Sequence, residues 1–333
     1  MEITGVASLA RKPDPTVLAA FAVIYLVWGS TYLAIKIAIT SLPPFTMTAI
    51  RSVVAGAILY AWGRCRGGSP PTLGQWGTGA LVGGLLFGIG HGGLSWAEQR
   101  VPSGAASLFI ATLPVWMTLL QLATDRERGL PPRTMVGVGA GSVGVLVLVG
   151  PSTLLGRDPI DLLGGAVLVV SAVGWAVGSA VARRVPHPAS LTITTGSYLL
   201  TGGAVLGTLA LVSGERFDPA ATTLTSLAAL AYLITFGSVV AFGAYSWLLR
   251  RQPLSAVSTY AFVNPVVALA MGWAFGGEVL NGRILGAATF VLAAVVLILT
   301  GSDPSHAPGR QRSMLVGRSR GGRSVRYRES EGS

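Results

Sequence analysis

The sequence is poor in charged residues and in cysteine. Of its 333 residues, 11% are Asp, Glu, Lys or Arg, whereas soluble domains usually contain about 25%. So few charges could not cover the water-facing surface of a chain this long, which excludes an ordinary soluble fold. Cys65 is the only cysteine, which excludes an intramolecular disulfide bond and a cysteine-based metal cluster.

Sequence signatures of enzymes are also missing. The chain contains no HExxH, GxSxG or CxxC motif and no paired acidic residues within an apolar run, and its three histidines form no ligand cluster. Metalloproteases, serine hydrolases and thiol redox proteins depend on such motifs. We therefore expect no enzymatic activity, no cofactor and no metal site.

The chain is instead rich in apolar residues and glycine. Hydrophobic residues make up 51% of it, the mean hydropathy is +0.63, and there are 45 glycines. Apolar runs of about 17–25 residues are long enough to cross a bilayer as helices. Ten such runs occur, at residues 17–39, 44–62, 75–96, 103–123, 134–149, 162–182, 189–212, 224–249, 255–276 and 284–300. We therefore predict an all-α, polytopic membrane protein with ten transmembrane helices.

A hydrophobic segment of 33 residues is duplicated, because residues 95–127 match residues 246–278 at a constant offset of 151 positions. The repeated residues include Trp96, Arg100, Pro102, Pro114 and Glu127, which recur as Trp247, Arg251, Pro253, Pro265 and Glu278. Duplicated hydrophobic units are typical of transporters built from two structural repeats. We assign residues 17–150 to the first repeat and 160–300 to the second. Each repeat would contain an odd number of helices, so the second is predicted to be inverted relative to the first.

The basic residues predict the orientation of the helices. If the N-terminus is cytoplasmic, 18 Lys and Arg residues fall on the cytoplasmic side and only four fall on the opposite side. The positive-inside rule therefore places residues 1–16 and 301–333 in the cytoplasm. The Gly-, Ser- and Arg-rich tail at 301–333 is predicted to be disordered. Abundant Ala, Gly and Arg with only two lysines is typical of a GC-rich bacterial genome, so we expect a bacterial inner membrane.

The net charge of +11 and the pI of about 10.6 do not indicate nucleic-acid binding. All the arginines except Arg51 lie in short loops or in the tail, between apolar runs. The tail could be a topology anchor resting on anionic lipid or could bind a regulatory partner. The expected partners are therefore membrane lipid and a small-molecule substrate, without nucleic acid. The oligomeric state is left open.

Polar side chains inside the first two apolar runs are candidates for a substrate site. Trp28, Tyr32 and Lys36 are spaced by four residues and share one face of the first predicted helix. Lys36 could face a cavity or could extend to the lipid headgroups. Arg51 lies about 10 Å inside the second helix at about 1.5 Å per residue. At that depth ionisable groups usually face a cavity or a partner.

The third apolar run adds His91 and Ser95 on one helix face. His91 could line a cavity or be a packed, hydrogen-bonded histidine. Glu98 follows this run and is expected to be a loop acid paired with Arg100. Since every Asp and Glu lies in a loop, in a tail or at the end of a run, no deep carboxylate is expected to carry a proton. Glu98, His91 and Lys36 are possible substitutes, and facilitated diffusion fits equally well.

Two duplicated prolines lie inside apolar runs. Pro114 and Pro265 each remove a backbone donor, so we expect symmetric kinks, or hinges, near the site. Asn264 lies beside Pro265 and one turn after Tyr260. Its amide could satisfy a carbonyl that the proline leaves unpaired, or it could bind substrate.

Three motifs, at residues 28–36 (WGSTYLAIK), 96–104 (WAEQRVPSG) and 258–266 (STYAFVNPV), resemble those of EamA-type members of the drug/metabolite transporter superfamily. The resemblance covers about residues 16–300 and is closest to the YedA-type inner-membrane exporter branch. It implies ten helices in two inverted repeats, a cavity lined chiefly by helices 1, 3, 4, 6, 8 and 9, and export of small metabolites or drugs. Relatives in this branch often have asparagine where this chain has His91, so the ring could make transport sensitive to pH.

We therefore expect a carrier that exports small metabolites or drugs by alternating access. The predicted substrate-binding residues are Trp28, Tyr32, Lys36, Arg51, His91, Ser95, Tyr260 and Asn264. Arg51 and Lys36 would attract an anionic group, and the aromatic side chains would hold the apolar part of the solute. The alternatives are a facilitative uptake carrier and a channel, although no carbonyl filter or ring of like charges indicates a channel.

Overall fold

The computed structural model describes residues 14–124, 132–154, 161–182, 184–249, 251 and 260–301. Within these ranges the helices are α1 (Pro15–Ala38), α2 (Pro44–Cys65), α3 (Leu73–Gly83), η1 (Gly84–His91), α4 (Gly92–Ala97), α5 (Ser103–Ile110), α6 (Leu113–Thr124), α7 (Pro132–Leu154), α8 (Leu162–Ala182), α9 (Leu191–Val212), α10 (Leu224–Tyr232), η2 (Leu233–Val240), α11 (Ala241–Leu249), α13 (Tyr260–Phe275) and α14 (Gly282–Gly301). No strand occurs in this part of the chain, so the all-α prediction is confirmed there. The tail predicted to be disordered lies outside the described residues apart from Gly301.

Among the described residues, six helices are long and apolar enough to cross a membrane. They are Pro15–Ala38, Pro44–Cys65, Leu73–Ala97, Leu162–Ala182, Leu191–Val212 and Leu224–Tyr245. Four shorter apolar helices, Ser103–Met117, Pro132–Val147, Val263–Phe275 and Gly282–Ile298, lie in the remaining predicted runs. Large apolar side chains such as Leu26 and Leu211 are 61% and 81% exposed, as expected of a surface that contacts lipid.

Local sequence signals account for where several helices begin. Asp14 precedes α1, and its carboxylate accepts a hydrogen bond from Thr16 N at 2.8 Å, which satisfies one of the unpaired amides of the first turn. Thr72 and Gln75 form a reciprocal capping box at the start of α3. These caps fix helix ends but do not determine which helices pack together.

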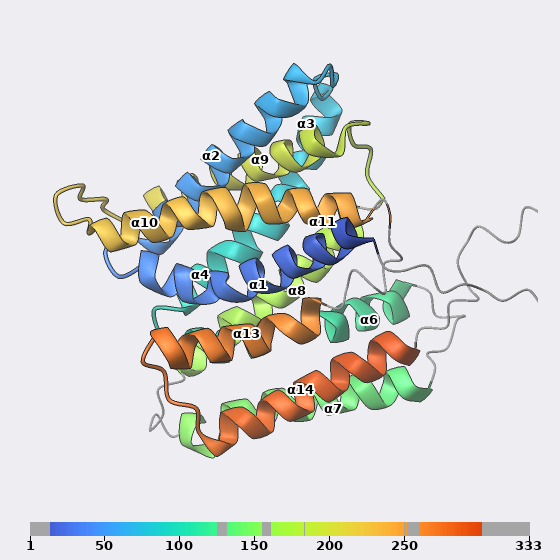
Figure 1. Cartoon of the computed structure of the whole chain (residues 1–333), viewed down its shortest axis with the longest axis vertical. Coiled ribbons are helices and arrows are strands. Elements are labelled where there is room, and N and C mark those ends of the chain that lie inside the picture. The colour runs from blue at the N-terminus through green and yellow to red at the C-terminus, as the bar shows by residue number, and fades with distance from the viewer. Residues whose placement is uncertain are drawn as a thin grey trace, which may run out of the picture.

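The helices run side by side in one bundle (Figure 1). At one edge of the bundle α2 packs along α9, and at the opposite edge α7 packs along α14, with α1, α8 and α13 between them. We name the two ends of the bundle by residues. The Glu98 end is where α1 and α4 end and α2 and α5 begin, and the Arg66 end is where α2 ends and α3 begins.

Contact between the backbones of α2 and α9 depends on glycine. A Cβ added to Gly196 would lie 2.7 Å from Tyr60 N, whereas a Cβ added to Gly207, also in α9, would meet nothing within 4 Å. Replacing Gly196 with alanine should lower the free energy of unfolding by about 1–3 kcal/mol, because overpacking forces the helices apart. Thermal unfolding in detergent would measure this loss. Gly207→Ala is the matched control, and equal loss in both variants would contradict the prediction.

Two π-helices occupy corresponding places in the two halves of the chain. The segments η1 and η2 both contain eight residues and are separated by 149 positions. Each continues directly from one α-helix into another. Such segments often lie at functional sites because they displace the backbone from its regular hydrogen-bonding pattern.

The two duplicated prolines have different surroundings. Pro114 lies in the first turn of α6, just after the helix is interrupted at Ala111 and Thr112. Thr112 Oγ1 donates a hydrogen bond to Phe109 O at 2.6 Å, which satisfies a carbonyl at this break. Pro265 lies inside α13, which continues through it. The described residues therefore show an interruption beside Pro114 and a continuous helix at Pro265, and the hinge role of either proline stays a prediction.

Candidate functional site

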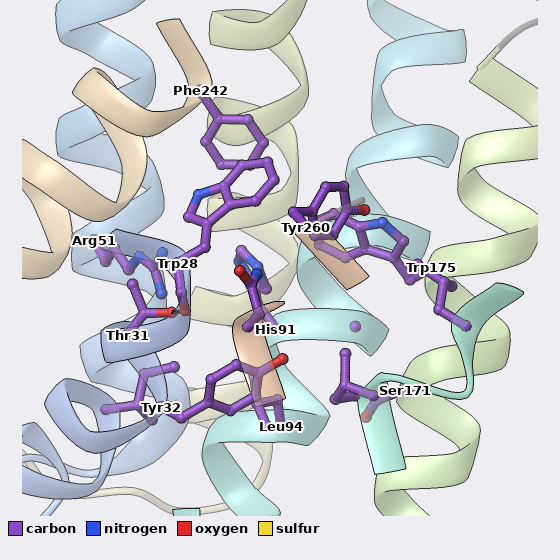
Figure 2. A pocket seen from close by; sticks show the side chains of 15 residues that line it. Trp28, Thr31, Tyr32, Arg51, His91, Leu94, Ser171, Trp175, Phe242 and Tyr260 are labelled. Atoms are coloured by element: carbon purple, nitrogen blue, oxygen red, sulfur yellow. Dashed lines mark hydrogen bonds between the residues drawn. The ribbon is translucent and has the colours of Figure 1, made fainter. Parts of the chain in front are cut away.

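A cavity of about 90 Å³ lies in the middle of the bundle. Figure 2 shows aromatic side chains surrounding it, with Phe242 on one side of Trp28 and Tyr32 on the other. The lining residues are Trp28, Thr31, Tyr32, Ile35, Arg51, Gly90, His91, Leu94, Ile110, Leu113, Ser171, Trp175, Phe242, Tyr260 and Asn264. They come from α1, α2, η1, α4, α5, α6, α8, α11 and α13.

Arg51 supplies a positive charge to the wall of this cavity. It lies on α2 and is only 3% exposed. Its Nε donates a hydrogen bond to Ser238 Oγ of η2 at 2.9 Å. No carboxylate oxygen lies within 4 Å of its nitrogens in the described parts of the chain. A buried cation with this arrangement can attract an anionic group that enters the cavity.

Trp28 is the centre of an aromatic cluster. Its ring centroid lies 5.3 Å from that of Phe242 and 5.2 Å from those of Tyr245 and Tyr260. Trp28 Nε1 donates a hydrogen bond to the Gly237 carbonyl of η2 at 3.1 Å, which fixes the indole. Aromatic rings held in this way can pack against the apolar part of a small solute.

His91 and Asn264 both line the cavity, in different settings. The His91 ring lies 4.9 Å from the ring of Trp175 and 5.3 Å from that of Phe87. With the Asn264 amide oriented to satisfy its neighbours, its nitrogen donates to the backbone carbonyls of Tyr25 and Tyr260, each at 3.2 Å. Asn264 therefore holds backbone carbonyls of α1 and α13 beside the cavity while remaining part of its wall.

The structure brings together most of the side chains selected from the sequence. Trp28, Tyr32, Arg51, His91, Tyr260 and Asn264 all line the cavity, whereas Lys36 and Ser95 do not. Ser95 is fully buried and its hydroxyl accepts a hydrogen bond from Thr48 at 2.8 Å. Lys36 Nζ donates to the backbone carbonyl of Glu98, so it neither faces the cavity nor extends to lipid headgroups.

Several lining residues were missed by the sequence analysis. Trp175 of α8 and Phe242 of α11 contribute large rings, but aromatic residues are common in apolar helices and nothing local distinguishes these two. Trp175 did carry one signal, because it matches Trp28 at an offset of 147 positions in the other half of the chain. Treating matched positions as a pair would have selected it.

The expected surface pair of Glu98 with Arg100 is wrong. Glu98 is 0% exposed. The Arg100 guanidinium instead lies 4.2 Å above the Trp96 ring, and its Nε is 3.9 Å from Asp161 Oδ1. The error has a physical cause: the burial of Glu98 depends on how the helices pack together, which the local sequence does not show.

The two ends of the bundle differ in how open they are. A recess of about 850 Å³ opens at the Arg66 end, lined in part by Trp62, Arg66, Thr195 and Trp247, and it shares Phe242 with the central cavity. At the Glu98 end the side chains are tightly buried, with Leu42, Met47, Ala97, Val101 and Ala105 each no more than 2% exposed. Across the described residues, no group of three or more His, Cys, Asp or Glu side chains could hold a metal ion.

A sequence profile of the EamA-like transporter family matches this chain twice, at residues 16–150 and 162–300. The chain belongs to the EamA-like transporter family. It is 34% identical over 294 residues to the uncharacterized inner membrane transporter YedA of Escherichia coli (strain K12), covering 87% of this chain and 92% of that protein. This EamA-like chain is therefore a transporter of the drug/metabolite class, as its motifs predicted.

Two further relatives and one solved structure extend the comparison. The chain is 27% identical to protein PecM of Dickeya dadantii, covering 82% of this chain and 88% of PecM. It is 25% identical to a probable amino-acid metabolite efflux pump of Salmonella typhimurium, covering 84% and 93% of the two chains. A solved crystal structure matches with a TM-score of 0.59 at 22% identity, over 85% of this chain and 96% of that one. At that identity the match supports the fold alone.

Proposed function

We propose that this EamA-like transporter is an alternating-access carrier that exports small amphipathic solutes bearing a carboxylate. The observation that carries the proposal is the pairing of a buried arginine, Arg51, with an aromatic cluster around Trp28 in one cavity. An anionic group would bind the guanidinium, and the apolar part of the solute would pack against the rings. The name of the Salmonella relative, a probable amino-acid metabolite efflux pump, agrees with solutes of this kind.

The proposal includes ten crossing helices in two inverted repeats. One feature that occurs in both halves supports the inversion. The Arg100 guanidinium stacks on Trp96 at 4.2 Å, and the Arg251 guanidinium stacks on Trp247 at 4.3 Å. The first pair lies at the end of α4, at the Glu98 end, while Trp247 lines the recess at the Arg66 end. The same local structure at opposite ends is what an inverted repeat produces.

The Arg66 end is proposed to face the cytoplasm, with both termini. A cavity of about 90 Å³ is small beside the roughly 300–1,000 Å³ of typical ligand sites, so the described conformation has no room for most solutes. The recess at the Arg66 end and the tight packing at the Glu98 end support a state closed to the outside. A continuous pore would need both ends open, which argues against a channel.

Solute counterflow tests the proposed function. Purified protein would be reconstituted into liposomes loaded with one unlabelled amino acid or aromatic carboxylate at a time, and uptake of the same labelled solute would be measured. A carrier is expected to give transient accumulation above equilibrium for at least one solute. Protein-free liposomes are the control. Equilibration without overshoot would indicate a channel, and no protein-dependent flux across the panel would overturn the proposal.

A further inference from the structure

Glu98 is a buried carboxylic acid without a hydrogen-bond partner. It directly follows α4, beyond the membrane-spanning segment Leu73–Ala97. The residue is 0% exposed, and neither carboxylate oxygen has a hydrogen-bond partner in the described structure. Burying an ionised carboxylate without hydrogen bonds is very unfavourable, so such a group binds a proton instead.

The neighbouring charges do not satisfy this carboxylate. Lys36 Nζ donates to the Glu98 backbone carbonyl rather than to its side chain. Glu278, which follows α13, accepts hydrogen bonds from Ser103 N at 2.6 Å and Gly104 N at 2.9 Å. Those two amides begin α5, where a helix stabilises negative charge, and neither Glu98 oxygen forms a hydrogen bond with this carboxylate in the described structure.

Other titratable and charged groups lie on elements of the same bundle. They are Tyr32 of α1, Arg51 of α2, His91 of η1, Glu215 after α9, Arg283 of α14 and the Arg100–Asp161 pair. Burial raises the pKa of the Glu98 carboxyl well above its usual range. Lys36 and Arg51 lower this pKa, Glu278 raises it, and the effect of burial is the largest of these.

We propose that Glu98 is a proton-binding site, which takes up a proton when the Glu98 end closes and releases it when that end opens to the outside. This inference rests on the proposed carrier function and its orientation. In the open state water would solvate an ionised Glu98. Closure removes that water and leaves Glu98 buried under the electrostatic influence of Glu278. One external proton therefore binds one Glu98 oxygen, converting the carboxylate to a neutral acid as the end closes.

The direction of the pH effect follows from this linkage. Because the closed state binds the proton more tightly, closure is fully favoured at external pH values below the pKa of Glu98 in the open state. As the external pH rises above that value, the ratio of open to closed protein increases by up to about tenfold per pH unit. The increase ends when the pH reaches the pKa of Glu98 in the closed state. An acidic exterior would thus return the carrier to its cytoplasm-facing form.

Cysteine labelling from outside tests the site without any solute. In a Cys65→Ser background, Leu42→Cys places a reporter at the closed end, where Leu42 is 2% exposed. Vesicles would be treated with a membrane-impermeant maleimide at external pH 5.5 to 8.5. Labelling at each pH would be divided by that of Asp218→Cys, an exposed position at the same end, which corrects for thiol chemistry. The normalised labelling is expected to rise with pH, by up to tenfold per unit.

Variants of Glu98 decide whether this residue is responsible. Glu98→Gln should remove the pH dependence and Glu98→Asp should retain it. Glu215→Gln is the matched control, because Glu215 lies at the same end but accepts hydrogen bonds from Phe45 N, Thr46 N and Thr46 Oγ1 at 2.8–3.0 Å. The normalised labelling of the Glu215→Gln variant should change with pH as it does in the parent protein. A flat parent profile, or a profile that survives Glu98→Gln, would overturn the proposal.

The labelling result and solute counterflow fail independently. If counterflow occurs but labelling does not change with pH, the proposed proton site is wrong and the carrier function still stands. If labelling changes with pH in a way that depends on Glu98 but no solute gives counterflow, the proton site is supported and the proposed class of solute is wrong. If Asp218→Cys is labelled only from the cytoplasmic side, the assigned orientation is wrong and the external site is overturned with it.

Discussion

Replacing Arg51 with alanine is expected to reduce transport of acidic solutes at least tenfold more than transport of neutral solutes. Arg51 is the cation that lines the central cavity, and hydrogen bonds to charged groups contribute about 1.5–3 kcal/mol. That range corresponds to about 10- to 150-fold in affinity. Initial rates of counterflow for matched acidic and neutral amino acids would measure the ratio.

Two control variants separate recognition of charge from damage to the fold. Arg51→Lys keeps a cation on α2 and should retain part of the preference for acidic solutes, although it loses the planar guanidinium. Arg100→Ala removes an arginine that packs on Trp96 at one end of the bundle and should leave the preference unchanged. Equal losses for acidic and neutral solutes in Arg51→Ala would show that Arg51 supports the structure rather than binding the anion.

Filling the cavity at Gly90 is expected to reduce transport of all solutes below one tenth of the parent rate. Gly90 lines the cavity on η1, and a Cβ there would already lie 3.0 Å from Trp175 Cε3. Valine adds three carbon atoms to a space of about 90 Å³, which leaves little room for a solute. The effect should be a loss of rate for acidic and neutral solutes alike, unlike that of Arg51→Ala.

The same substitution at Gly77 provides the control for Gly90→Val. Gly77 lies on α3, which continues into η1, and a Cβ there would meet nothing within 4 Å. Both variants place a β-branched residue in the same continuous helix, so they share any loss from helix propensity. Gly77→Val should therefore transport at nearly the parent rate. Similar rates in the two variants would show that the cavity does not lie on the transport route.

The distribution of residues along the chain was enough to predict the class of protein. Long apolar runs, scarce charges and the match between residues 95–127 and 246–278 indicate a duplicated membrane transporter. These properties can be read from the sequence alone because the bilayer imposes the same length and apolar composition on every crossing helix. The motif at residues 28–36 then predicted the family, which the EamA-like profile confirms.

Local spacing predicted part of the candidate site but not all of it. Trp28 and Tyr32 share a helix face, and both line the cavity. Lys36 continues the same face but does not line the cavity, because its side chain extends to the Glu98 carbonyl beyond it. Periodicity defines a face along one helix, whereas a cavity occupies only the part of that face that neighbouring helices leave uncovered.

Composition, apolar run length and duplication by themselves determined that this chain is a helical transporter with polar side chains inside its apolar segments. Only the tertiary structure decided that Arg51 meets Ser238, that η1 and η2 both contribute to the site, and that Glu98 is fully buried. The physical reason is that burial and charge pairing depend on contacts between residues far apart in sequence. Glu98 follows a helix and reads as a loop residue in the sequence, and only the packing of the whole bundle buries it.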